Sequence, residues 1–343
     1  MPGEQPLYRH VVGFALGPVT LPAQTMQFTT SWTQIDSIPT STPGLLPGEP
    51  PIRLLKEGST LYRLRCAKRP ADGDFTSDSS WLTAENTWPD TLAFQLNGHF
   101  LEPRRKLHHG RYLPIDITPH LRPGENTLNV YVLPNPHDKT PYALAIETVG
   151  VSSHSTITSR IPTLPPAQSL AAIKRSFSNP SHSSSGDDDE DFIMTSSTLT
   201  IPLFDPFRAD RICAIPVRGA ACLHRDCFDL ETFLSQCRRE EPGYPCVPDC
   251  WRCPICKGDV RPQTLVKDGF LMEVREELGR RGMLGTRAIV VEADGGWRPR
   301  AEEKGTGVRS ASLEREEAGV EALGDGVGKG KRKGRVVEVI ELD

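Results

Sequence analysis

The strongest constraint on the fold of this 343-residue chain is a compact set of cysteine and histidine residues, Cys222-x-His224 followed by Cys253-x-x-Cys256. A zinc ion in a structural site takes four thiolate or imidazole ligands at tetrahedral angles. A Cys-x-x-Cys turn supplies two of them. A Cys-x-His pair on an extended segment supplies two more, because residues i and i+2 of a strand point to the same face. The pattern therefore predicts one complete structural zinc site.

A disulfide framework is the alternative for a chain with nine cysteines. Eight of the nine lie between positions 213 and 256, and only Cys66 lies in the N-terminal half. This clustering, the interposed histidine and the lack of a signal-peptide pattern favour metal in a reducing compartment. Cys246 and Cys250 leave a second metal open, although one zinc is favoured. A catalytic cysteine is disfavoured, since no cysteine has a partner histidine outside the metal pattern.

The composition of the whole chain limits the remaining classes of protein. Its net charge of −4 at pH 7 gives no overall basic field that would attract nucleic acid. No apolar run approaches the length that spans a bilayer, so we expect a soluble intracellular protein without a membrane partner. The length allows two ordinary domains with linkers.

The N-terminal part, residues 7–150, is predicted to be an antiparallel β-sandwich. Apolar and polar residues alternate over 91–96, Asn97-Gly98 has the sequence of a hairpin turn, and a strand resumes at 99–101. Three further segments also read as strands: 59–66, 126–133 and 142–149. Several short strands between turn signals are typical of a sandwich.

Two segments are predicted to be disordered. Residues 151–196 are dominated by Ser, Thr and Pro and end in a serine cluster followed by the acidic run 187–191. They contain too little apolar surface to offset the entropy of ordering. The serines beside the acids suggest phosphorylation, but a solvated acidic spacer is favoured. Residues 286–335, a tail rich in charged residues and glycine, form the second segment.

Two helices are predicted in the C-terminal half. Residues 228–237 have apolar side chains at positions 230, 233, 234 and 237, the spacing of one helical face. Residues 268–278 form the second helix, which is expected to pack three apolar side chains on the domain: Leu271, Val274 and Leu278. The chain as a whole is therefore predicted to be a multidomain α+β protein.

Short motifs around the predicted ligands resemble the SP-RING (MIZ-type) zinc finger of the PIAS/Siz/Zmiz family, whose members are SUMO-protein ligases and transcriptional co-regulators. The motifs occur in the family's order: Leu199–Leu203, Ile215–Gly219, Cys222-x-His224-x-x-Cys227-Phe228-Asp229 and Trp251-x-Cys253-Pro254-x-Cys256. The resemblance covers residues 197–285. It implies a RING-shaped fold that keeps a single zinc ion.

The same resemblance assigns roles to individual residues. The implied zinc ligands are Cys222, His224, Cys253 and Cys256. Cys227 is then a buried thiol at the start of the central helix. Ile201 departs from the family, which usually has cysteine there. Because that position resembles a core residue more than a ligand, isoleucine should be tolerated.

Upstream, Leu113–Thr118 resembles the PINIT region of the same family, in which a Pro-Ile-x-Ile-Thr element precedes a strand. The same residues also read as plain sandwich core, and the two interpretations are compatible. The N-terminal domain is thus expected to be PINIT-like.

The function implied by the resemblance is that of a SUMO-protein ligase, which binds a SUMO-charged conjugating enzyme and promotes SUMO transfer to substrate lysines. Catalysis would come from positioning, without a covalent ligase intermediate and without a catalytic residue. The implied contacts with the conjugating enzyme are Pro202, Leu203, Pro254 and Ile255. Leu230 or Phe233 of the central helix can contribute, or can be plain core.

The last residues, 336–343, resemble a SUMO-interacting motif, with Val337, Val339 and Ile340 flanked by acids. Such a motif adds a strand to the edge of a partner's sheet. A strand that pairs with the chain's own sandwich is the alternative. The basic run 329–335 suggests nuclear localisation or a nucleic-acid contact, and the protein is expected in the nucleus.

Two other functions compete with the ligase. A Zmiz-like transcriptional adaptor would use the zinc fold only as a docking surface, and a ubiquitin ligase fits the docking groove but not the terminal motif. PIAS proteins usually begin with a helical DNA-binding domain, whereas the sandwich here starts almost at Met1, so DNA binding is left open. Chromatin proteins and transcription factors are the expected substrates.

Overall fold

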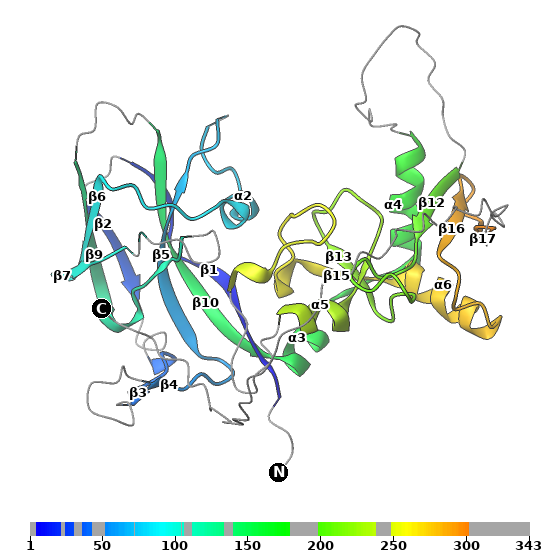
Figure 1. Ribbon diagram of the computed structural model, residues 1–343, viewed down its shortest axis with the longest axis horizontal. Helices are drawn as coiled ribbons and strands as arrows, with labels where there is room; N and C mark the ends of the chain where they lie inside the picture. The colour runs from blue at the N-terminus through cyan, green and yellow to red at the C-terminus, as the bar shows by residue number, and fades with distance from the viewer. Residues whose placement is uncertain are drawn as a thin grey trace, which may run out of the picture. The chain divides into compact units, whose positions relative to one another are not determined.

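The computed structural model describes residues 5–21, 25–30, 36–42, 52–71, 73–103, 105, 112–133, 140–178, 198–237 and 248–301 (Figure 1). The chain divides into two compact units, residues 1–40 with 54–300 and residues 41–53 with 301–343. In the second unit, β3 (Ser41–Thr42) and β4 (Ile52–Arg53) form a short antiparallel ladder. All features below belong to the first unit. Among the described residues, no helix combines the length and the apolar composition that crossing a membrane requires.

The N-terminal domain contains two four-stranded antiparallel sheets. The first has the order β1 (Leu7–Thr20), β10 (Tyr142–Ser153), β5 (Thr60–Lys68) and β8 (Ile115–Asp116). The second has the order β2 (Thr25–Thr30), β9 (Gly124–Val132), β6 (Leu92–Leu96) and β7 (His99–Leu101). One core cluster joins the sheets, with Leu64 and Ile146 from the first and Phe94 and Leu128 from the second. The predicted antiparallel sandwich is confirmed.

The hairpin between β6 and β7 turns at Asn97-Gly98. Both residues have positive φ values, 51° and 90°, as a two-residue type I′ turn requires. Beside the sandwich, α2 (Asp78–Thr83) begins with a capping box at Ser77 and buries Trp81 completely. A single turn of 3-10 helix, η1 (Thr118–His120), follows the short strand β8.

The predicted disordered linker is wrong over residues 151–178. Strand β10 continues to Ser153 and is followed by three elements: α3 (His154–Arg160), β11 (Thr163–Leu164) and α4 (Pro166–Ser178). The segment has few apolar residues, but Ile157, Ile161 and Ile173 are each at most 3% exposed. Average composition failed here because a small number of well-placed side chains pack into the neighbouring domain. Residues 179–197 lie outside the described part of the chain.

The C-terminal domain is built on two small sheets. In one, β11, β15 (Leu265–Asp268), β13 (Pro216–Gly219) and β14 (Phe228–Asp229) lie in that order, and β11 pairs with β15 in parallel. The other has the order β12 (Thr198–Pro202), β16 (Ala288–Glu292) and β17 (Trp297–Pro299). The domain therefore extends to about residue 300, and the predicted disordered tail begins too early. Ile289 and Val291, fully buried on one face of β16, explain why this segment is ordered.

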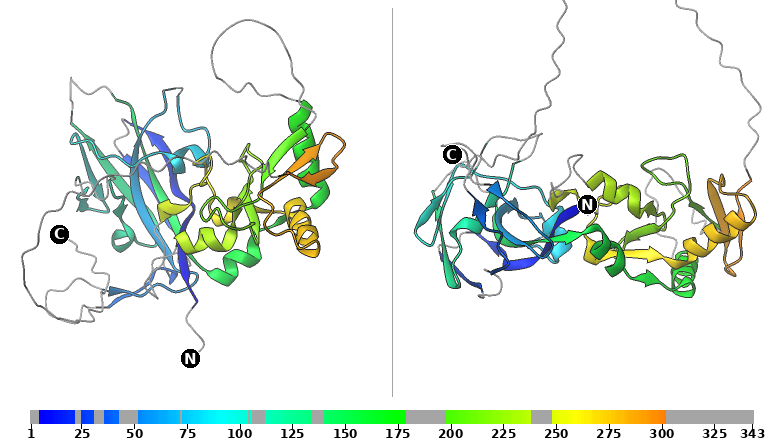
Figure 2. Two further views of the ribbon diagram at one scale, coloured as in Figure 1. Left: turned by 45° about the vertical axis from the view of Figure 1, so that its right-hand side comes forward. Right: turned by 90° about the horizontal axis from the view of Figure 1, so that it is seen from below.

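Both predicted helices are present. The central helix α5 (Leu230–Cys237) buries the expected face, including Phe233 and Leu234. Helix α6 (Gly269–Arg280) buries Leu271, Val274 and Leu278 as predicted. Helices α4 and α6 share one core cluster with β12 and β16, and α4 lies beside the orange strands β16 and β17 in both views of Figure 2. Two turns of 3-10 helix, η2 (Pro248–Cys250) and η3 (Pro262–Thr264), flank the loop of residues 251–261.

The sandwich and the C-terminal domain share a core. Tyr8 of β1 belongs to the same buried cluster as Phe233 and Trp251. The indole Nε1 of Trp251 donates a 2.7 Å hydrogen bond to the carbonyl oxygen of Arg9. The Val11 carbonyl accepts a bond from Arg261 at 2.9 Å. These contacts join the edge strand β1 to the segment that carries the second pair of predicted zinc ligands.

Candidate metal centre

The four predicted ligands come together at one point of the C-terminal domain. Cys222 and His224 lie on the loop after β13, and Cys253 and Cys256 lie on the turn between η2 and η3. One ligand atom from each residue lies within 4.8 Å of the others. Cys222 Sγ is 3.6 Å from Cys256 Sγ, and His224 Nε2 is 3.3 Å from Cys253 Sγ.

This geometry fits a single zinc ion. Zn–S bonds of about 2.3 Å and Zn–N bonds of about 2.0 Å at tetrahedral angles place two sulfurs about 3.8 Å apart and a sulfur and a nitrogen about 3.5 Å apart. The observed 3.6 Å and 3.3 Å separations are close to these values. Three cysteines and one histidine also form a common structural donor set. With four protein ligands, the site leaves no position for a reacting water.

Hydrogen bonding fixes which nitrogen of His224 can bind the metal. The Nδ1 atom lies 2.9 Å from the backbone carbonyl oxygen of Asp226. A carbonyl only accepts, so Nδ1 carries the proton and donates. Nε2, which faces Cys253, is left as the lone-pair donor for a metal ion, and the bond from Nδ1 to the Asp226 carbonyl holds the ring in orientation.

The turn that carries Cys253 and Cys256 stabilises negative charge on sulfur. The Cys222 thiol hydrogen bonds to Cys253 and, with the backbone amides of Cys256 and Ile255, lowers the pKa of Cys253 to about 4. The same bond raises the pKa of Cys222, which keeps the shared proton. Binding of a divalent cation displaces this proton, because metal-bound cysteine is a thiolate. Lys257 closes the turn with φ of 62°, and its amide donates to the Cys253 carbonyl.

Gly219, the last residue of β13, gives the Cys222 sulfur room. A Cβ atom at this position would lie 2.9 Å from Cys222 Sγ, 3.0 Å from the Asp259 carbonyl oxygen and 3.1 Å from Val260 Cγ1. The φ angle of Gly219 is not in the left-handed region, so space alone excludes a side chain here. The residue therefore brings the two ligand-bearing loops close together.

Asp229 organises the start of the central helix, a role that the motif alone did not reveal. Its carboxylate accepts hydrogen bonds from the amides of Ala214, Ile215 and Thr232. Burial would raise the pKa of Asp229, but these amide bonds outweigh it and lower the pKa. An aspartate three residues before Thr232 is a recognisable helix N-cap signal.

The other residues singled out by the motifs are core residues. Cys227 is 4% exposed and Ile201 is fully buried, as expected. Cys237 is buried with its thiol near the carbonyl oxygen of Cys250. Within the described part of the chain, the sole cluster of three or more potential metal ligands consists of Cys222, His224, Cys253 and Cys256. Cys246 lies outside the described residues, so a second metal stays untested.

The predicted contacts with a conjugating enzyme are placed unequally. Pro202 is exposed, and Pro254 and Ile255 are half-buried on the zinc-binding turn. Leu203 is only 4% exposed and packs in the core, so its prediction as a surface contact is wrong. Side chains alternate between the two faces along strand β12, and Leu203, two residues after Ile201, follows the same alternation. Its side chain therefore points inward and packs in the same core cluster as Ile201.

Phe207 is an exposed aromatic residue that sequence reasoning missed. It is 39% exposed, and its ring centroid lies 6.2 Å from that of Phe233 on the central helix. The signal was an apolar residue after Asp205-Pro206, in a loop where polar residues are usual. The predicted SUMO-binding residues Val337, Val339 and Ile340 lie outside the described residues.

Comparisons with known proteins agree with the motifs. The family profile of the MIZ/SP-RING zinc finger matches residues 205–259. The E3 SUMO-protein ligase pli1 of Schizosaccharomyces pombe is 29% identical over 110 residues, which are 32% of this chain and 13% of pli1. The human zinc finger MIZ domain-containing protein 1 is 24% identical over 216 residues, 62% of this chain and 19% of that protein. The crystal structure of the S. cerevisiae SUMO E3 ligase SIZ2 covers 88% of this chain and 97% of its own, with 19% identity and a TM-score of 0.34, too low to support an argument about the fold.

The similarity is therefore concentrated on part of each relative, since this chain spans 13% and 19% of the lengths of the two proteins that it matches in sequence. The matched segment 205–259 contains all four ligand residues of the metal centre. Motif order, ligand geometry and profile thus agree on the same residues. This chain carries a MIZ/SP-RING zinc finger and is related to the SUMO-protein ligases and Zmiz proteins that share this domain.

Proposed function

We propose that this protein is a SUMO-protein ligase that acts as a scaffold. The observation that carries the proposal is the metal centre: four protein side chains converge, enough to fill all four positions around a zinc ion, in a domain related to those of SUMO ligases. A bound zinc ion would cross-link two loops and supply no reacting group. Any catalytic effect must then come from the surface that these loops present.

A small apolar surface on the zinc finger is suited to a protein partner. Ile255 is partly exposed and packs against the same core cluster as Phe233, whose ring also contacts the exposed Phe207. Pro254 is half-buried next to Ile255. We assign these residues, together with the exposed Pro202, to the contact with a SUMO-conjugating enzyme. In this assignment Phe207 takes the place of Leu203 as a contact residue, because the Leu203 side chain is buried.

The proposed mechanism is positioning of a SUMO thioester. The zinc finger would hold the conjugating enzyme, and the terminal residues Val337, Val339 and Ile340 would hold SUMO through strand addition. Restricting the thioester near a substrate lysine raises the effective concentration of the reacting groups. The chain needs no nucleophile of its own, and none of its cysteines forms an intermediate. The PINIT-like sandwich would present substrates, among which we include chromatin proteins and transcription factors, in the nucleus.

The test is discharge of SUMO from its conjugating enzyme onto free lysine, with and without the zinc-loaded protein. In the double variant Phe207→Ala, Ile255→Ala, the acceleration of SUMO discharge should fall about tenfold, the scale expected for losing two apolar interface contacts. Met283→Ala is the matched control, because Met283 is also 39% exposed. Zinc content should be unchanged in all three proteins. Absence of any acceleration by the folded, zinc-loaded wild type would contradict the proposal.

The second candidate is a non-catalytic adaptor of the Zmiz kind. One observation favours it: the match to the human MIZ domain protein extends over 216 residues, against 110 for the ligase pli1. An adaptor would bind partner proteins through the same surface without accelerating discharge. The discharge assay therefore separates the two functions.

A further inference from the structure

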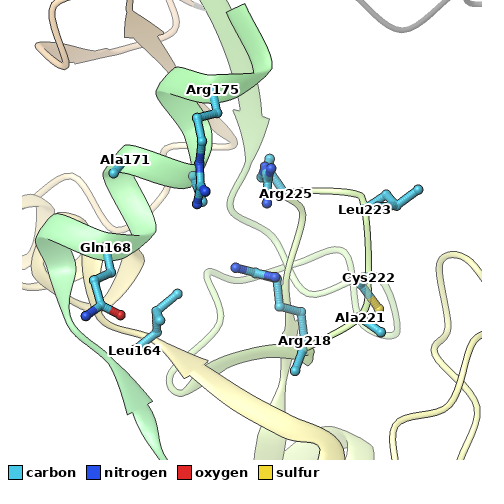
Figure 3. Close-up of a pocket in the computed structure, with 11 residues that line it drawn as sticks. Leu164, Gln168, Ala171, Arg175, Arg218, Ala221, Cys222, Leu223 and Arg225 are labelled. Carbon is cyan, nitrogen blue, oxygen red and sulfur yellow. The ribbon is translucent and has the colours of Figure 1, made fainter. Parts of the chain in front are cut away.

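A basic cavity lies between α4 and the loop that carries the first two zinc ligands. Its volume is about 790 Å³, within the range typical of ligand sites. Among the residues that line it are three arginines, Arg175 of α4, Arg218 of β13 and Arg225 of the zinc-binding loop, and no acidic residue. Figure 3 shows the three guanidinium groups directed into the same space. None of the residues that line the cavity belongs to the surface assigned above to the conjugating enzyme.

Arg218 forms the floor of this arginine cavity. Arg218 is 5% exposed, and its Nε atom is buried without a hydrogen-bond partner among the described residues. The carboxylate of Asp268 lies 3.6 Å from that nitrogen, so the two side chains form a buried ion pair that is longer than a hydrogen bond. The Asp268 carboxylate also accepts hydrogen bonds from Ser169 at 2.6 Å and from the Leu271 amide at 3.1 Å, so its negative charge is shared among several donors. The end of the Arg218 guanidinium group faces the cavity, as Figure 3 shows, where an anion can accept hydrogen bonds from its terminal nitrogens.

The two other arginines, Arg175 and Arg225, line the same cavity as Arg218. Arg175 is exposed in the last turn of α4, seven residues after Gln168, which lines the same cavity. Seven residues are two helical turns, so both side chains lie on one face of α4. Arg225 is half-buried and follows the ligand His224 directly. Converging guanidinium groups are the usual means by which proteins bind carboxylate and phosphate oxygens.

The lining of the cavity favours a peptide over a nucleic acid. Leu164 and Ala171 line its walls, and Leu223 at its rim is 92% exposed. A nucleic-acid backbone would use an extended basic surface, because phosphates repeat along the strand. An acidic peptide offers one oxyanion for the arginines and neighbouring apolar groups for Leu223. We propose that the arginine cavity binds an acidic segment of a partner protein through a carboxylate or phosphorylated side chain.

The test uses the zinc-loaded full-length chain and two fluorescent peptides. One has a phosphoserine followed by aspartates, and the other is the same peptide with an unmodified serine. Saturable binding of the phosphorylated form alone, competed by inorganic phosphate, identifies phosphate as the bound group. Equal binding of both peptides identifies carboxylate. Arg175→Gln should weaken binding about tenfold, the effect of losing one charge-assisted hydrogen bond. Because Arg175 is exposed, zinc content and circular dichroism should not change.

The control is Arg280→Gln, which removes an exposed arginine from the last turn of α6. It should leave the affinity within about twofold, because Arg280 does not line the cavity and its ion pair is with Glu277 of the same helix. Failure of both peptides to bind saturably would overturn the proposal, and so would equal weakening by the two variants. Tighter, Arg175-dependent binding of a single-stranded oligonucleotide would assign the cavity to nucleic acid instead. No conjugating enzyme is present in these measurements, so their outcome is independent of the ligase function.

Discussion

The guanidinium group of Arg63 lies 2.7 Å from the carboxylate of Asp249, although 186 residues separate them in the chain. Arg63 belongs to β5 of the sandwich, and Asp249 belongs to η2, just before the zinc-binding turn. Arg63 also bonds Glu147 of β10, at 2.5 Å through Nε. One side chain thus connects the interior of the sandwich with the segment that carries Cys253 and Cys256.

Replacing Asp249 should lower stability modestly. The Asp249 side chain is 40% exposed, so solvent screens its attraction to Arg63. We expect Asp249→Asn to reduce the free energy of unfolding by about 1 kcal/mol. Urea denaturation measures the change. Asp210→Asn is the control, because it removes a charge whose partner Arg208 is local and exposed. A loss of equal size in both variants would show that the contact with Arg63 contributes nothing specific.

Glu147 should matter much more than Asp249. It is fully buried and accepts from three donors, Arg63, Arg65 at 2.7 Å and the Trp81 indole at 2.8 Å. Glu147→Gln keeps the shape but leaves the buried Arg65 without its counter-charge and Arg63 with Asp249 as its remaining carboxylate partner. We expect a loss of about 3–5 kcal/mol in the free energy of unfolding. The exposed Glu102→Gln should change it by less than about 0.5 kcal/mol.

The same residue predicts a pH dependence. Burial alone would raise the pKa of Glu147, but the charges of Arg63 and Arg65 outweigh it, so the folded-state pKa is lowered from 4.5. A carboxylate with a lowered folded-state pKa stabilises the fold above its unfolded pKa of about 4.3 and loses that contribution at lower pH. The difference in unfolding free energy between wild type and Glu147→Gln should therefore be constant at neutral pH and shrink below about pH 4.3. A difference that stays constant or widens there would contradict this assignment.

Gly219→Ala should weaken zinc binding. The added methyl would lie 2.9 Å from Cys222 Sγ and 3.0 Å from a backbone oxygen that cannot move away easily. Displacing one ligand should reduce zinc affinity about tenfold or more, as changes around metal ligands typically do. Competition with a chromophoric chelator gives the affinity. Gly285→Ala is the control, since a Cβ atom there meets nothing within 4 Å.

Cys253→Ser should release the zinc and unfold the C-terminal domain. Structural zinc in small fingers contributes about 10–16 kcal/mol of apparent folding free energy. Zinc content and circular dichroism should fall together, and a strong chelator should reproduce the effect in the wild type. Cys227→Ser separates ligands from other cysteines, because Cys227 is buried in the same motif outside the ligand cluster. That variant should keep its zinc.

Local patterns predicted the zinc ligands, the two helices and most of the sandwich strands, because each depends on residues close together in sequence. The Asn97-Gly98 turn is one example, since its backbone conformation is set by two residues. Composition averaged over a long segment was less reliable. It missed α3 and α4, where Ile157 and Ile173 become buried only through contacts with residues distant in the chain.

Long-range relationships could not be predicted from this single sequence. Nothing in the neighbourhood of Arg63 or Asp249 indicates that the two are partners. The arginine cavity is similar: Arg175 lies in a segment expected to be disordered, and Arg218 reads as an ordinary strand residue. Their convergence depends on the parallel pairing of β11 with β15, which anchors the start of α4 on the same sheet as β13, with β15 between β11 and β13.

The shared core of the two domains has a practical consequence for recombinant work. Cutting the gene at the limits of the profile match, residues 205 and 259, would discard α4, α6 and β16, whose side chains share a core cluster with Ile212 and Cys227. Starting instead at α3 would strip Tyr8 from Trp251 and leave the indole without its carbonyl acceptor. Expression boundaries should therefore enclose residues 5–301 as one piece.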